Sequence, residues 1–167
     1  MKTALIAGFV FLFGMSAFAQ TVEVRFSEQF QEQLDETYGE REGDYLSREI
    51  KKDLKRALDR SNVDVHRVVV TIERAKPNRP TIKQLDRNPA ISLGDSFGLG
   101  GMELRGQAFD KSGEPITDEM TYSWFERDIR NVIGFATWTD AHRASNRFSR
   151  RFTKSIRNEL MRQQKST

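Results

Sequence analysis

The chain contains no cysteine, and histidine and proline are also scarce, with two and four copies among 167 residues. Without cysteine there is no disulfide framework, no thiol nucleophile and no thiolate metal site. The two histidines, His66 and His142, lie far apart and lack carboxylates at the spacing of known metal motifs. The sequence therefore predicts neither a metal nor any other cofactor.

Disorder and low complexity are also excluded. Hydrophobic residues make up 37 % of the chain, which is too much for an intrinsically disordered protein. Eleven glycines and four prolines are too few for a low-complexity chain. The length fits one globular domain, and packing alone has to hold it together because no disulfide is available.

One long apolar run is present, at residues 4–13, and it follows a single lysine. Alanines stand one and three residues before Gln20. This pattern predicts a secretory signal peptide over residues 1–19, cleaved between Ala19 and Gln20. Because the run is too short to span a bilayer, we expect the mature chain, residues 20–167, to be periplasmic or secreted and not transmembrane.

In the mature chain, alternating hydrophobic and polar residues predict strands, and apolar residues spaced by three or four predict helices. The predicted strands cover residues 21–26, 63–73, 102–108 and 116–124. The predicted main helices cover residues 44–61, with Asp44 as N-cap, and residues 139–163. This order predicts a single α+β domain over residues 20–167, arranged βα-β-(long loop)-ββ-α. We expect a four-stranded, mostly antiparallel sheet with the two main helices packed on one face.

Residues 77–101 show no convincing periodicity and are interrupted by proline and glycine, which predicts a long irregular loop. Long loops inside compact domains are often functional, so Phe97, Gly100 and Gly101 are candidate binding residues. The glycines are not a P-loop, because they lead into a strand and lack the following Lys-Ser/Thr. The alternative is that they only shape the start of that strand.

Charge is distributed unevenly along the chain. Residues 141–167 contain eight basic residues and one acid, Glu159, whereas residues 20–140 contain 18 basic and 23 acidic residues. On a helical wheel, five basic residues fall opposite Phe148. These candidate binding residues are Arg143, Arg147, Arg150, Lys154 and Arg157. The last helix is therefore predicted to be basic and amphipathic.

Three interpretations of this basic face remain open. It is a solvated surface that the acidic body partly neutralises, a contact for phospholipid headgroups or lipopolysaccharide, or a contact for an acidic envelope protein. Nucleic acid is excluded as a partner, because export is predicted and no recognised base-stacking motif is present.

Catalytic constellations are mostly absent from the sequence. No serine lies in a nucleophile-elbow pattern, although Asp140 and His142 are close enough in sequence for a carboxylate to orient an imidazole. Trp138 belongs to an aromatic group that is either core or a recognition patch, and we include it among the candidate binding residues. The alternative to a binding module is a small hydrolase-like enzyme, or an enzyme inhibitor, that uses residues 97–101 together with Trp138, Asp140 and His142.

Several short motifs carry a resemblance to known proteins. They are Asn88-Pro89 through Leu93, Ser96-Phe97-Gly98-x-Gly100-Gly101, Leu104-x-Gly106, Asp110-x-x-Gly113, Trp138-x-Asp140-Ala141, Ala144 and Phe148. On these residues the segment 84–152 resembles a family of uncharacterised exported bacterial proteins. Its layout is also similar to small envelope domains of the TolB N-terminal kind. The resemblance implies export and a βαββα domain, and it assigns no catalytic residue.

The sequence therefore predicts an exported, periplasmic binding or assembly module of the bacterial envelope. Its expected partner is an envelope protein or an anionic lipid or lipopolysaccharide surface.

Overall fold

The computed structural model describes residues 20–131, 134 and 136–166, so the predicted signal peptide lies outside the described residues. Within these ranges, no helix combines the length and the apolar character that crossing a bilayer requires.

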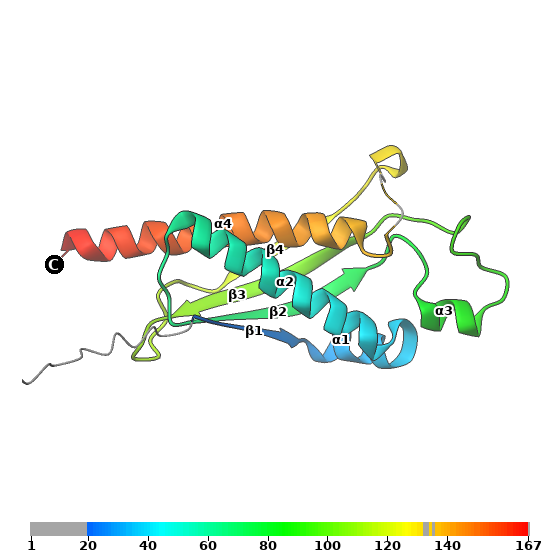
Figure 1. The fold of residues 1–167 in the computed structure, drawn as a ribbon, viewed down its shortest axis with the longest axis horizontal. Coiled ribbons are helices and arrows are strands. Elements are labelled where there is room, and N and C mark those ends of the chain that lie inside the picture. The colour runs from blue at the N-terminus through cyan, green and yellow to red at the C-terminus, as the bar shows by residue number, and fades with distance from the viewer. Residues whose placement is uncertain (1–19, 132–133, 135, 167) are drawn as a thin grey trace, which may run out of the picture.

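Four strands form one mixed sheet in the order β1-β2-β3-β4 (Figure 1). Their bounds are β1 Thr21–Phe26, β2 Arg67–Lys76, β3 Gly101–Phe109 and β4 Met120–Phe125. The pair β1–β2 is parallel, and the pairs β2–β3 and β3–β4 are antiparallel. The predicted α+β class and the mostly antiparallel four-stranded sheet are confirmed.

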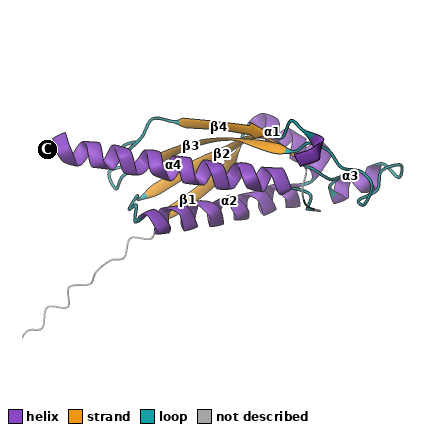
Figure 2. Ribbon diagram, turned by 90° about the horizontal axis from the view of Figure 1, so that it is seen from above, coloured by secondary structure: helices purple, strands orange, loops and turns teal. Residues whose placement is uncertain are grey.

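Two long helices, α2 and α4, lie side by side on one face of this sheet, as predicted (Figure 2). The helices are α1 Glu28–Gln33, a π-helical turn Leu34–Tyr38, α2 Glu40–Ser61, α3 Ile82–Arg87, a 3-10 turn Ile129–Asn131 and α4 Thr139–Ser166. Each long helix has one apolar stripe, which it buries against the strands. The connection from β1 to the parallel strand β2 runs through α2, as parallel pairing requires.

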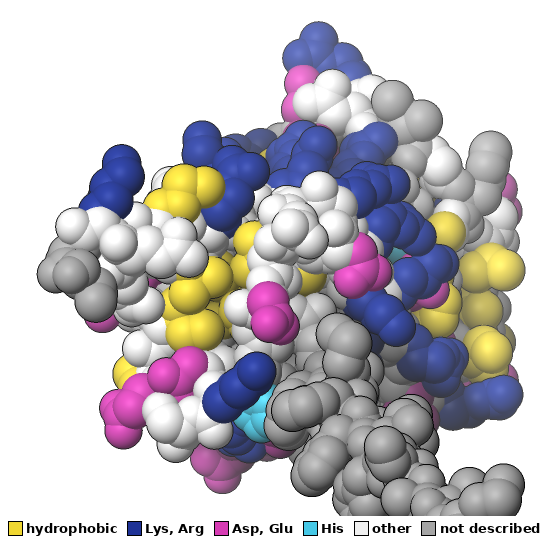
Figure 3. All heavy atoms as spheres, turned by 60° about the vertical axis from the view of Figure 1, so that its left-hand side comes forward, with side chains coloured by type: hydrophobic (Ala, Val, Ile, Leu, Met, Phe, Trp, Pro, Cys, Tyr) yellow, Lys and Arg dark blue, Asp and Glu magenta, His cyan; other side chains and the backbone are white. Residues whose placement is uncertain are grey.

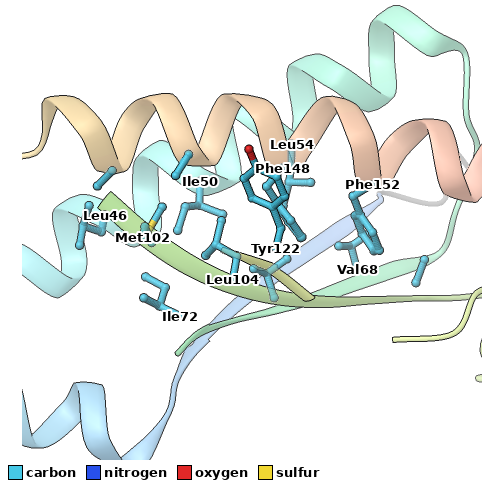
Figure 4. Packing of buried hydrophobic residues seen from close by; sticks show 14 of the residues in the cluster. Leu46, Ile50, Leu54, Val68, Ile72, Met102, Leu104, Tyr122, Phe148 and Phe152 are labelled. Atoms are coloured by element: carbon cyan, nitrogen blue, oxygen red, sulfur yellow. The ribbon is translucent and has the colours of Figure 1, made fainter. Parts of the chain in front are cut away.

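The core lies between the sheet and the two long helices (Figure 4). Phe148 and Phe152 of α4 are fully buried and stack with ring centroids 5.2 Å apart. Each large buried side chain contributes about 1.5–3 kcal/mol to folding. Gly106 of β3 makes room for them, because a Cβ atom there would lie 2.7 Å from Phe148 Cζ. The glycine in the sequence pattern Leu104-x-Gly106 thus leaves space for the Phe148 ring to pack against β3.

Helix α2 begins at Glu40, so the prediction of Asp44 as its N-cap is wrong. The predicted start at residue 44 leaves Gly43 outside the helix. In the structure Gly43 is buried inside the helix, where a Cβ atom would lie 2.6 Å from Leu34 Cδ1. This glycine allows the helix to pack closely, and the turn residue is Gly39, which has a φ of 99°.

Other boundaries also shift. Strand β2 begins at Arg67 rather than at Val63, and β4 begins at Met120 rather than at Ile116. Val63 and Ile116 are buried all the same, because they pack into the core from the connections.

The segment predicted as irregular, residues 77–101, contains the short helix α3. Thr81 and Gln84 cap its N-terminus reciprocally in a capping box. The spacing Thr-x-x-Gln was the sequence signal for this helix.

All four arginines of the strands form ion pairs. Arg105 lies 2.6 Å from Glu73 and 3.3 Å from Glu119, and these pairs raise the pKa of its guanidinium. The others are Arg25 with Glu23 (2.7 Å), Arg67 with Glu23 (4.0 Å) and Arg74 with Glu103 (2.5 Å). We call these the strand arginines. The positive charge of the strand arginines is thus neutralised locally, by carboxylates on the same strand, on a neighbouring strand or, for Glu119, just before β4.

Candidate functional site

Helices α2 and α4 run in the same direction and are joined by polar side chains at several points. Two hydrogen bonds join them, Tyr45 Oη with His142 Nε2 (3.0 Å) and Ser145 Oγ to Asp53 Oδ2 (2.8 Å). Trp138, the residue before α4, donates a third bond to α2, from Nε1 to Glu42 Oε2 (2.6 Å). The residue numbers rise together along both helices, which shows their parallel course. Their apolar stripes face the sheet, so the opposite side of the helix pair is left polar.

On this polar side, α2 and α4 border a groove of about 680 Å³, which we call the cationic groove. Seven lysine and arginine side chains line it, against a single carboxylate, Asp53. The seven are Arg56, Arg60, Arg143, Arg147, Arg150, Lys154 and Arg157. Figure 3, seen from the end at which α4 terminates, shows Lys and Arg side chains gathered in a band with few acids among them. The structure thus brings together all five basic residues that the sequence singled out, and adds two from α2.

Two of the five basic residues that α4 contributes to the groove already have partners within the protein. Arg143 donates a hydrogen bond from NH1 to Asp140 Oδ1 at 3.1 Å. The guanidinium of Arg147 lies over the Trp124 ring, with Cζ 4.4 Å from the ring centroid. This is a cation–π contact on the β4 side of the helix, so Arg147 contributes mainly its stem to the groove.

Of the two arginines from α2, Arg56 lies 3.8 Å from the buried carboxylate of Asp53. The remaining four cations form no ion pair, hydrogen bond or ring contact with any residue in the described ranges. They are Arg60, Arg150, Lys154 and Arg157. Like charges held in one groove repel each other, and a bound anion relieves this repulsion.

Three buried hydroxyls follow one another along α4. Ser145, Ser149 and Thr153 follow each other at every fourth position of α4 and are almost fully buried. Ser145 donates to Asp53, whereas Ser149 Oγ and Thr153 Oγ1 have no hydrogen-bond partner within the part of the chain that the structure describes. An unpartnered buried hydroxyl costs about 1–3 kcal/mol. Of the two unpartnered hydroxyls, Ser149 belongs to a residue that lines the groove.

The glycine-rich candidates take part in a buried polar network. Asn78 Nδ2 donates to Asp140 Oδ2 at 2.5 Å and to the carbonyl of Gly98 at 3.1 Å, and Asn78 Oδ1 accepts from the Asp140 N–H at 2.8 Å. The N–H of Gly100 also donates to Asp140 Oδ2, at 3.2 Å. We call this network the Asn78 latch, because it ties the connection after β2 to the first turn of α4. Gly101, the next residue, begins β3.

The aromatic candidates separate in the structure. Trp138 is 1 % exposed and packs edge-on against Tyr38, with ring centroids 5.6 Å apart, so it belongs to the core. Phe97 is 57 % exposed, and the guanidinium of Arg79 lies over its ring at 5.8 Å. The two residues therefore do not form one recognition patch.

Asp140 and His142 lie in separate hydrogen-bond networks. Asp140 is fully buried in the Asn78 latch, whereas His142 contacts Tyr45 and Glu49 of α2. Burial, reinforced by nearby carboxylates, raises the pKa of Tyr45. Its hydroxyl therefore stays protonated at neutral pH and can donate to the imidazole. The carboxylate–imidazole pair that the enzyme alternative requires is not brought together, and no metal-binding group of His, Asp and Glu occurs among the described residues.

A second hollow, of about 710 Å³, lies beside Tyr38 and Trp138. Acidic residues such as Glu40 and Asp86 share its lining with Arg41 and Lys83. Since both signs of charge are present, this hollow selects less strongly by charge than the cationic groove does.

Three residues of the candidate groove and of the Asn78 latch carry no signal in the sequence pattern. Arg60 lies on α2, so a helical wheel drawn for the last helix alone does not include it. Ser149 differs from an ordinary helix serine only by its burial. Asn78 lies between two prolines, and no periodic pattern marks it.

Comparisons with known proteins identify no family. No protein-family model matches the chain, and no curated protein is similar to it. Among solved structures, a minor lipoprotein from Acinetobacter baumannii aligns over 85 % of this chain and 92 % of its own, with 12 % identity and a TM-score of 0.39. The resemblance to domains of the TolB N-terminal kind is not confirmed. A likeness at this level assigns neither a family nor a function, so the function has to be argued from the groove itself.

Proposed function

We propose that the chain is an exported, non-catalytic binding module of the bacterial envelope that contacts an anionic lipid surface through the cationic groove. The observation that carries this proposal is the set of four cations, Arg60, Arg150, Lys154 and Arg157, that have no acidic partner among the described residues. Export is the prediction made from residues 1–19.

The position of these cations favours a lipid surface over a soluble acidic protein. The last part of α4 extends past the sheet (Figure 1). There Met161 is half-exposed beside the basic residues Arg162 and Lys165. A basic helix end with an exposed apolar side chain suits the interface of an anionic membrane.

Co-sedimentation of residues 20–167 with vesicles tests the proposal. The vesicles are neutral, anionic-phospholipid or lipopolysaccharide-containing, each at low and high NaCl. We expect binding to both anionic sets, weakened by salt because the Debye length shortens.

The variant Arg150→Gln/Lys154→Gln should abolish this binding. Its matched control is Lys51→Gln/Lys55→Gln, which removes the same charge at the same spacing from exposed positions of α2 outside the groove. Equal loss in both variants would mean general charge attraction and would overturn the role of the groove. Absence of binding to every vesicle would contradict the proposal, and an acidic envelope protein would then be sought by crosslinking.

A further inference from the structure

We infer that the cationic groove contains a discrete site for a phosphate ester, formed by Arg60, Arg150, Lys154 and Arg157 around the hydroxyl of Ser149. The ligand class is a phosphorylated small group, either free in solution or carried as a lipid headgroup. This inference rests on the proposed function, because it names the chemical group that the groove recognises.

Only one of the four cations has a position that helix electrostatics favours. Arg60 lies in the last turn of α2, where a cation favourably meets the carboxyl end of a helix. Arg150, Lys154 and Arg157 lie in the middle of α4, where the helix dipole offers them no such role. Their concentration on one side of one groove therefore calls for another source of negative charge.

Asp53 limits where an anion can lie. Its carboxylate is 7 % exposed, accepts a hydrogen bond from Ser145 and lies 3.8 Å from Arg56. This negative charge disfavours an anion at the Asp53 end of the groove. One helical turn further along α4, at Ser149, the lining carries cations and no carboxylate.

The Ser149 hydroxyl is an independent indication of a ligand. It is 1 % exposed, belongs to a residue that lines the groove, and has no hydrogen-bond partner in the described part of the chain. A hydroxyl can donate to an anion's oxygen, which would satisfy it. The groove thus offers a neutral donor at its floor and guanidinium and ammonium donors at its rim.

The donor set favours phosphate over carboxylate. Guanidinium groups bind phosphate oxygens in pairs, and a tetrahedral anion can accept from donors on several sides at once. The groove volume of about 680 Å³ falls within the range of small-molecule sites, roughly 300–1,000 Å³. A phosphorylated headgroup or small organophosphate therefore suits it better than an extended polymer.

Thermal shift and isothermal titration with soluble probes test the site. The probes are inorganic phosphate and glycerol 3-phosphate, with glycerol and NaCl of equal ionic strength as controls. We expect both phosphates to raise the Tm and to bind, whereas glycerol and NaCl have no such effect. Absence of phosphate binding would overturn the inference.

Two hydroxyl variants distinguish the site from general charge attraction. Ser149→Ala should weaken glycerol 3-phosphate binding about 2- to 10-fold, as the loss of one hydrogen bond predicts, and should leave the Tm without ligand unchanged or higher. Thr153→Val removes a hydroxyl that is equally buried and unpartnered but does not line the groove, so binding should be unaffected. Equal effects of the two variants would overturn the assignment of Ser149.

Comparison with the vesicle assay separates the two proposals. Vesicle binding without binding of soluble phosphate would contradict the discrete site and leave the proposed function standing. Binding of soluble phosphate without vesicle binding would support the site and contradict the lipid surface as its partner.

Discussion

The strand arginines and the cations of the groove differ in whether a carboxylate lies close to them. Every strand arginine has a carboxylate within 4.0 Å, whereas four groove cations have none among the described residues. The difference does not come from a shortage of acids, because residues 20–140 contain 23 of them. Acidic residues are thus present where the sheet displays positive charge and nearly absent where the groove does.

Stability does not explain this difference. Exposed ion pairs contribute only about 0–1 kcal/mol each, so pairing on the sheet adds little. Repulsion in the groove is unfavourable for folding at low salt. A surface that retains such repulsion is typical of a binding site, where the compensating charge comes from the ligand.

The largest expected effect comes from breaking the anchor that holds the groove. Asn78→Ala should lower the free energy of unfolding by about 3 kcal/mol, because the buried Asp140 carboxylate loses the hydrogen bond from Asn78 Nδ2 and the Asp140 N–H loses its acceptor, Asn78 Oδ1. Urea denaturation measures the change. Asn146→Ala, an exposed asparagine of α4, should change it by less than about 0.5 kcal/mol. Equal changes in the two variants would contradict a contribution of the Asn78 latch to the free energy of unfolding.

A smaller effect is expected on the sheet. Arg105→Gln should lower the free energy of unfolding by about 0.5–1 kcal/mol, because Glu73 and Glu119 lose their shared partner. The loss should shrink at high NaCl, where surface charges are screened. Urea denaturation at two salt concentrations measures both numbers, and a loss independent of salt would point to packing instead.

The groove should respond with the opposite sign. Arg150→Gln/Lys154→Gln should raise the free energy of unfolding by about 0.2–0.5 kcal/mol at low salt, because like charges four residues apart on a helix repel. Lys51→Gln/Lys55→Gln removes the same kind of pair from α2 and should stabilise similarly. The two variants thus match in stability and differ in binding. Destabilisation by the groove variant would mean that its cations have partners.

The smallest effect concerns local pairing in the turn after β3. Hydrogen bonds from Ser112 and neighbouring backbone N–H groups hold the pKa of Asp110 below its ordinary value of 3.8. A depressed pKa means that this stabilisation is present above the unfolded-state pKa and is lost as pH falls through the folded-state value. NMR titration should show a low midpoint for Asp110 that rises in Ser112→Ala. An unchanged midpoint would contradict the role of Ser112.

The periodicity of the sequence predicts which side chains share one face of a helix. It does not predict contacts that depend on how two elements pack together. The common face of the five groove cations of α4 follows from the rotation of about 100° per residue in a helix. The contact of Arg147 with the Trp124 ring depends on β4 packing beside the helix, so the pattern of α4 alone does not reveal it. Arg56 and Arg60 of α2 also line the groove. Their part in it can be predicted only if the parallel packing of α2 against α4 is known.

Glycine was the other source of error. Gly43 and Gly106 are both buried at close contacts, but the predicted bounds leave the first outside the helix and place the second in a strand without indicating a close neighbour. Composition marks a glycine without saying whether the backbone bends there or a neighbour approaches closely. The same ambiguity left residues 97–101 open between function and structure. The Asn78 latch gives Gly98 and Gly100 structural contacts.

The Asn78 latch also has a kinetic consequence. It joins residues 62 positions apart, and the bond between Trp138 and Glu42 spans 96. Contacts of such long sequence separation form slowly, because large loops must close before they are made. The groove therefore exists only after the last helix has docked. A partly folded chain carries all the cations without the groove, so binding of the proposed phosphate ester would report that folding is complete.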